Sequence, residues 1–84
     1  MHKVLLGPAA EKDLDKLPKS LFTRIIKELK ALEENPRPRG SRKIVGTVSD
    51  WRVRVGDYRI VYEIREEEKE IKVMRIKHRR EAYR

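Results

Sequence analysis

The sequence predicts an α+β fold in which an N-terminal strand and a helical hairpin pack on one face of a twisted, mainly antiparallel sheet. Residues 19–34 carry apolar side chains at the helical spacings of three and four. Trp51–Ile64 alternates apolar and polar residues about a central Gly-Asp pair, and Glu70–Ile76 alternates again. With 84 residues, the chain has room for one domain and one modest core.

The N-terminal half predicts one strand followed by two helices. Lys3–Leu6 is a short apolar run, and Pro8 after it suits the first turn of a helix because its missing N–H is not needed there. A short helix over Ala9–Lys16 has an apolar stripe of Ala10, Leu14 and Leu17. Pro18 ends that helix and can begin the next. The second helix, Lys19–Glu34, has a longer stripe that consists of Leu21, Phe22, Ile25, Ile26, Leu29 and Leu32.

The segment between the helices and the hairpin predicts a loop. Residues 35–40 hold two prolines and a glycine, which disfavour regular structure. Ser41–Val48 has little periodicity, and we expect Ile44 and Val45 to anchor it to the core.

The Gly56-Asp57 pair predicts a two-residue hairpin turn, because glycine adopts a positive φ at no steric cost. This turn sets Arg54 opposite Arg59 and Trp51 opposite Tyr62, and directly opposed residues share a face. One face is then apolar or aromatic: Trp51, Val53, Val55, Tyr58, Ile60 and Tyr62. The other face carries three arginines: Arg52, Arg54 and Arg59. A slip of one residue would put arginines into the core, so the register is well specified.

The last predicted strand, Glu70–Ile76, has two candidate inward faces. Ile71 and Val73 compete with Met74 and Ile76, and alternation alone does not choose between the two pairs. A charged run precedes the strand and predicts the turn that leads into it.

The tail after this strand is basic and ends in an aromatic residue. Antiparallel pairing with the second hairpin strand would bring the start of the tail to the end where Tyr58 and Arg59 lie: Lys77, His78 and Arg79. Tyr83 could reach the same region. An aromatic ring beside clustered arginines would give a stacking platform next to a phosphate clamp, an arrangement that suits single-stranded RNA.

The composition points to an anionic partner. The chain holds 22 Lys and Arg against 14 Asp and Glu, a net charge of +8, which favours nucleic acid, the ribosome or an acidic protein. Cysteine is absent and the two histidines, His2 and His78, lie at opposite ends, so we expect no metal and no cofactor. No apolar run reaches the length of a signal peptide or a membrane span, and we expect a cytoplasmic protein.

The three arginines need an explanation, because like charges directly opposite each other destabilise a hairpin. Arg54 opposite Arg59 is such a pair. The alternative to a binding role is an ordinary solvated surface. Arginine offers bidentate hydrogen bonds to phosphate at a charge that does not titrate away, so we expect this face to bind an anion.

The order of a short strand, a helical hairpin, WRVRVGDYRIVYEI and a closing IKHRREAY resembles the RelE/ParE superfamily of toxins from bacterial and archaeal toxin–antitoxin pairs. The likeness covers nearly the whole chain and implies a single RelE-like toxin domain over residues 1–84. RelE-type members are implied to be ribosome-dependent endoribonucleases that cut mRNA in the A site, whereas ParE-type members are implied to poison DNA gyrase. An acidic cognate antitoxin, bound in a toxin–antitoxin hetero-oligomer, is the implied protein partner.

The resemblance also implies site residues. The basic positions before and after the turn fall on Arg52, Arg54 and Arg59, although RelE itself has lysines at the first two. The basic residue of the closing strand falls on Arg79, or on Lys77 with another placement of the gap, and the C-terminal tyrosine falls on Tyr83. Because all these positions keep a cation or an aromatic, the resemblance favours the RelE type over the ParE type.

These residue types suit cleavage in which the 2′-hydroxyl of the RNA attacks the adjacent phosphorus, giving a cyclic phosphate and a free 5′-hydroxyl. The arginines would stabilise the charge of the transition state, and Tyr83 would stack on or hydrogen-bond to the attacking nucleotide. Arginine stays protonated near neutral pH and is a poor proton acceptor. His78 is of the residue type suited to proton transfer, and Glu63, on the face of Arg59, is an alternative. A non-catalytic RNA-binding module is the rival interpretation of the same face.

Overall fold

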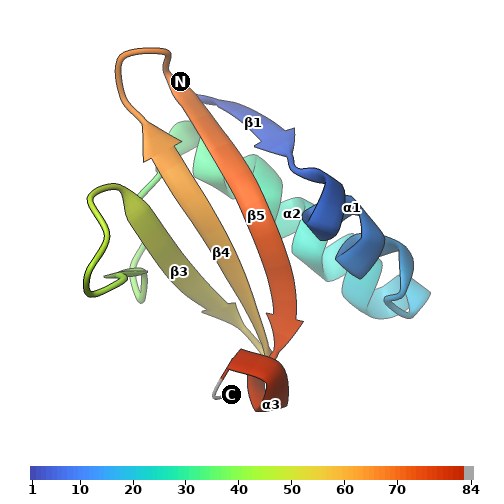
Figure 1. The fold of residues 1–84 in the computed structure, drawn as a ribbon. Helices are drawn as coiled ribbons and strands as arrows, with labels where there is room; N and C mark the ends of the chain where they lie inside the picture. The colour runs from blue at the N-terminus through green and yellow to red at the C-terminus, as the bar shows by residue number, and fades with distance from the viewer. Residues whose placement is uncertain (83–84) are drawn as a thin grey trace.

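The computed structural model describes residues 1–82 and has two helices on one face of a five-stranded sheet (Figure 1). The elements in chain order are β1 (Lys3–Leu6), α1 (Pro8–Asp15), α2 (Lys19–Glu34), β2 (Arg42–Lys43), β3 (Asp50–Val55), β4 (Tyr58–Arg65), β5 (Glu70–His78) and α3 (Arg79–Ala82). The strand order is β1-β5-β4-β3-β2; β1 pairs in parallel with β5, and the other pairs are antiparallel. The predicted α+β fold, with a helical hairpin on a mainly antiparallel sheet, is confirmed.

The helical hairpin covers the apolar face of the sheet with the residues that its periodicity predicts. Helix α1 begins at Pro8, in the first turn, and α2 has the predicted bounds. The buried side chains of the two helices are Ala10, Leu14, Ile25, Leu29 and Leu32. Phe22 lies at the edge of this stripe and is 38% exposed, so it adds less to the core than predicted.

The core centres on β4 and β5. The largest fully buried side chains are Tyr62, Ile25, Leu32, Ile60, Ile71 and Val73. Burial of an aliphatic side chain of this size contributes about 1.5–3 kcal/mol to folding. The Tyr62 hydroxyl donates to the carbonyl oxygen of Pro36 at 2.8 Å, and burial raises the pKa of this tyrosine. This hydrogen bond holds the loop after α2 against the sheet.

A bulge in β5 explains why alternation could not choose its inward face. Val61 pairs with Arg75 whereas Tyr62 pairs with Val73, so Met74 is an extra residue on β5. The bulge changes the alternation, and both Val73 and Ile76 are buried as a result. The register of β3 with β4 matches the prediction at each of the predicted pairs.

The segment between α2 and β3 differs from its prediction. Val45 is 97% exposed, so the expectation that it anchors this segment to the core is wrong. The segment is held by hydrogen bonds instead: the N–H of Ile44 donates to the carbonyl oxygen of Asp50 at 2.9 Å, and the Thr47 side-chain hydroxyl donates to the carbonyl oxygen of Ile44, also at 2.9 Å. These bonds position the short strand β2 at the edge of the sheet.

Asp13 fastens α1 to β5. Its carboxylate accepts hydrogen bonds from Arg75 at 2.8 and 3.1 Å and from the backbone N–H of Ile76 at 2.9 Å. Burial of the carboxylate by itself raises the pKa of Asp13, but these hydrogen bonds and the Arg75 charge together hold it below its ordinary value. The ionised carboxylate is therefore favoured in the folded state.

We expect Asp13→Asn to lower the free energy of unfolding by about 1–3 kcal/mol near neutral pH, because a charged hydrogen-bonded clamp is lost. The folded-state pKa is depressed, so the wild-type advantage is present above the ordinary aspartate pKa and is lost as pH falls through the folded value. Urea unfolding at about pH 7 and about pH 3 checks this, with the exposed carboxylate of Asp15 changed to Asn as a control. If the free energies of unfolding of wild type and Asp13→Asn differ by the same amount at both pH values, the ionised carboxylate of Asp13 does not supply the stabilisation.

Candidate functional site

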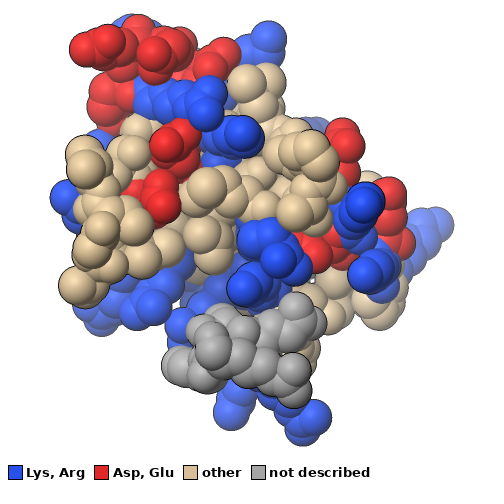
Figure 2. Space-filling model, viewed as in Figure 1, with Lys and Arg blue, Asp and Glu red and all other residues tan. Residues whose placement is uncertain are grey.

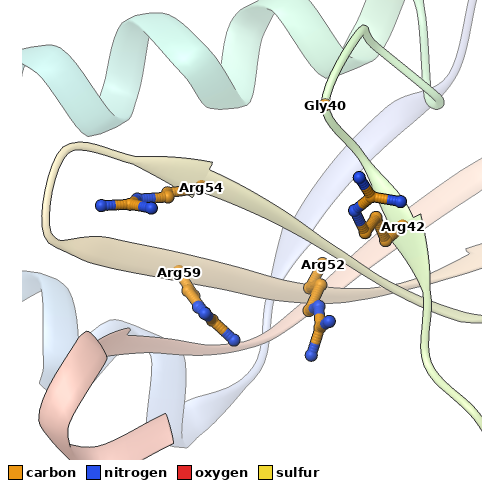
Figure 3. A pocket seen from close by; sticks show the side chains of 5 residues that line it. All are labelled: Gly40, Arg42, Arg52, Arg54 and Arg59. Atoms are coloured by element: carbon orange, nitrogen blue, oxygen red, sulfur yellow. The ribbon is translucent and has the colours of Figure 1, made fainter.

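The sheet face that the helices leave open carries a hollow of about 180 Å³, which we call the arginine hollow. It is lined by Gly40, Arg42, Arg52, Arg54 and Arg59. Figure 3 shows Arg52 and Arg59 extending to the same side of β3 and β4, Arg54 running along its strand, and Arg42 coming from the neighbouring strand. The three arginines predicted from the hairpin are thus brought together, and a fourth joins them.

The backbone explains why these side chains meet. Gly56 has φ +60° and closes the tight turn between β3 and β4, which sets Arg54 directly opposite Arg59. The Nε of Arg54 donates to the carbonyl oxygen of Gly56 at 3.0 Å, which holds this side chain near the turn. Arg52 lies two residues before Arg54, on the same face, and pairs with Arg42 on β2.

The arginine hollow is strongly cationic. Among residues 1–82, no carboxylate lies within ion-pair distance of Arg42, Arg52 or Arg54. Arg52 and Arg54 are two residues apart on one strand, a spacing of about 7 Å. Two unit charges at this distance in water repel by about 0.6 kcal/mol. A bound anion would remove this repulsion.

The charges on this side of the molecule are unevenly distributed. Figure 2 shows Asp and Glu gathered over the turn between β4 and β5, whereas Lys and Arg gather toward the other end of the sheet, near α3. An anionic ligand is therefore attracted to the end of the sheet that carries the arginine hollow.

The basic residues at the end of β5 do not all face the arginine hollow. Lys77 pairs with Arg59, and directly opposed residues share a face, so Lys77 lies on the arginine side of the sheet. Arg79 begins α3, where its N–H donates to the carbonyl oxygen of Asp57 at 2.6 Å and its guanidinium lies 3.9 Å from the Asp57 carboxylate. Tyr83 lies outside the described residues.

His78 lies on the helix side of the sheet. It pairs with Tyr58, and the two rings meet edge to face with their centroids 5.2 Å apart. Its Nδ1 accepts a hydrogen bond from the backbone N–H of Arg80 at 3.3 Å. It lines a recess with Leu21 and Arg24 of α2 rather than the arginine hollow. The alternation that puts Tyr58 on the apolar face could have predicted this.

Glu63, the other candidate for proton transfer, is also separated from the arginine hollow. Its carboxylate accepts a hydrogen bond from the Nε of Arg65 at 2.6 Å. It lies four residues from Arg59 along β4, a distance of about 13 Å at the usual rise of a strand.

Residues 1–82 contain no group of three or more His, Cys, Asp or Glu side chains placed to hold a metal ion. In the same part of the chain, no helix is long and apolar enough to span a bilayer.

Comparison with known proteins agrees on one family. A family model described as the ParE toxin of the type II toxin–antitoxin system parDE matches residues 4–83. The chain is 32% identical to a chain of an archaeal RelE–RelB complex from Pyrococcus horikoshii OT3, with a TM-score of 0.83 over 93% of this chain and 94% of that one. No curated protein sequence matches it.

Two further solved structures show the same fold at lower identity. A chain of a RelBE toxin–antitoxin complex from Mycobacterium tuberculosis is 24% identical, with a TM-score of 0.82 over 92% of this chain and 96% of that one. The isolated RelE toxin of E. coli is 21% identical, with a TM-score of 0.82 over 93% of this chain and 84% of that one.

Proposed function

The chain belongs to the RelE/ParE superfamily of type II toxin–antitoxin toxins, and from this premise we propose that it is a ribosome-dependent endoribonuclease. It cuts mRNA in the A site and so halts translation. The arginine hollow is the observation that carries this proposal: four guanidinium groups on one open face, with Lys77 at the register position beside Arg59. Guanidinium groups in this arrangement suit the phosphates of a single-stranded message.

In the proposed reaction, the 2′-oxygen of the message attacks the adjacent phosphorus. A 2′,3′-cyclic phosphate forms, the bond from phosphorus to the 5′-oxygen breaks, and the proton lost from the 2′-hydroxyl is balanced by one gained on that 5′-oxygen. Arg52 and Arg59 stabilise the extra negative charge on the phosphorane-like state, and Lys77 stabilises the departing oxygen. Ribosomal RNA supplies alignment that a domain of this size does not.

His78 tests how protons move in this reaction. Since its ring packs on Tyr58, on the helix side of the sheet, we expect His78→Ala to change the rate of message cleavage by less than about tenfold. Loss of a true general base costs about 10²–10⁴ in rate. Single-turnover cleavage on ribosomes measures the effect, with Arg59→Ala as the positive control. A hundredfold loss in folded His78→Ala would assign the histidine to proton transfer.

We also propose that an acidic antitoxin neutralises this chain. The net charge of +8 favours such a partner, and the similar archaeal structure is a RelE–RelB complex. Coexpression with the product of the adjacent gene, followed by size-exclusion chromatography, checks for a hetero-oligomer. A chain that elutes as a monomer in the presence of that product would contradict this pairing.

The rival function is that of a ParE-type gyrase inhibitor, because the matching family model carries the ParE name. Induced expression in a bacterium separates the two. The ribonuclease predicts growth arrest with new 5′ ends inside codons of cellular messages. Gyrase-dependent DNA breaks with intact messages would instead establish the ParE-type function, and intact messages with protected footprints would indicate an RNA-binding module.

A further inference from the structure

Arg42 extends the cationic face onto a fourth strand. It lies on β2, the two-residue strand at the edge of the sheet, and pairs directly with Arg52. Its neighbour Lys43 pairs with Trp51 and therefore faces the opposite side of the sheet. Both cations are exposed, so one strand presents one positive charge to each face.

The Cα atoms of Arg42 and Arg59 lie well apart on the sheet. The two residues lie two strands apart and two residues out of register. A strand spacing of about 4.8 Å and a rise of about 3.4 Å per residue put their Cα atoms about 12 Å apart. One phosphate near each residue, both on the same RNA strand, suits this separation.

Gly40 lines the arginine hollow together with Arg42. This residue has φ +90°, a conformation that favours glycine, and a Cβ placed there would meet nothing within 4 Å. The hollow, about 180 Å³, greatly exceeds the roughly 10–15 Å³ that one ordered water needs. It has room for an anion with several oxygens.

We propose that Arg42 forms a second phosphate subsite at the β2 edge of the arginine hollow, which holds a backbone phosphate of single-stranded RNA next to the one bound by Arg52 and Arg59. The RNA as ligand rests on the proposed function, but binding at this subsite is separate from cleavage. Arg42 is a substrate-positioning residue here: it fixes the path of the message across β4, β3 and β2 and takes no part in bond breaking.

A short 2′-O-methyl oligoribonucleotide tests the subsite, because it keeps every phosphate and lacks the attacking hydroxyl. Its affinity for wild type, Arg42→Ala and Lys43→Ala is measured over a range of salt concentrations. Each lost phosphate contact reduces the slope of log affinity against log salt by about 0.7 for a single strand. We expect that reduction, with weaker binding at low salt, for Arg42→Ala and no reduction of the slope for Lys43→Ala. Circular dichroism checks that both exposed-site variants are folded.

Two results would overturn the subsite: equal slopes for wild type and Arg42→Ala, or equal reductions for the two variants, which would reflect net charge alone. Polyglutamate of similar length is the control ligand. Dependence on Arg42 for polyglutamate but not for the oligonucleotide would assign this end of the hollow to an acidic protein and reject the RNA subsite.

The outcome is independent of the nuclease proposal. A slope that depends on Arg42, in a protein that leaves ribosome-bound message uncut, would support the subsite and reject the nuclease. Cleavage by wild type, together with a salt slope that does not depend on Arg42, would support the nuclease and reject the subsite.

Discussion

Arg52→Ala combined with Arg59→Ala is expected to lower cleavage of ribosome-bound message by at least about 10³-fold while the domain stays folded. Each preorganised donor that meets developing negative charge typically contributes about 10²–10³ in rate. Both side chains lie outside the core, on the open face of the sheet. Single-turnover cleavage measures the rate, and urea unfolding measures the stability of the same preparation.

The matched control removes the same charge from another surface. Lys27 and Lys30 are exposed on α2, and we expect the variant with both changed to alanine to cleave within about threefold of wild type. Equal losses in the two double variants would mean that only the net charge matters. Full cleavage by the folded arginine variant would remove the nuclease assignment.

Lys77→Ala is expected to lower cleavage by about 10²-fold, whereas Arg79→Ala lowers it by less than about tenfold. Lys77 shares the face of Arg59, while Arg79 is held at the start of α3 by Asp57. The family resemblance alone left both residues open for the same role. Side-by-side rates on ribosomes measure the contrast, and Asp57→Asn controls for loss of the contact to α3.

The opposite order of effects would contradict this assignment. A hundredfold loss in Arg79→Ala, with wild-type rates in both Lys77→Ala and Asp57→Asn, would place the functional cation on α3. Equal large losses in Lys77→Ala and Arg79→Ala would mean that both cations contact the message.

Features that depend on neighbouring residues were predictable from the sequence. The turn at Gly56 fixes the register of β3 and β4 by itself, and the apolar alternation of both strands supports the same register. The second helix was predicted to its ends because its stripe is long and Pro18 marks its start.

Features that depend on distant pairing were not predictable in the same way. β2 is two residues long and has no periodicity, so nothing local indicates that Arg42 joins the other arginines. The bulge at Met74 arises from the pairing of β5 with β4, and alternation in β5 alone cannot reveal it. Val45 is as apolar as a core residue, yet it is exposed in a loop that is held by hydrogen bonds of Ile44 and Thr47.

His78 shows how a candidate residue can share one end of the sheet with the arginines and still lie on the other face. It is distant from Arg59 in the sequence, and the antiparallel pairing of β4 with β5 brings the two residues to the same end of the sheet. Nearness along the sheet does not decide the face, because successive side chains alternate. Applying the alternation from Tyr58 would have separated His78 from the arginines.

The most direct test uses purified ribosomes that hold a defined message, with or without a single 2′-deoxy nucleotide at the mapped cut. We predict that the protein creates a new 5′-hydroxyl end inside the A-site codon of the unmodified message. The cut disappears with the 2′-deoxy nucleotide and with Arg52→Ala plus Arg59→Ala. A message that stays intact with wild-type protein, or a cut that survives loss of both arginines, would contradict the assignment of ribonuclease activity to the arginine hollow.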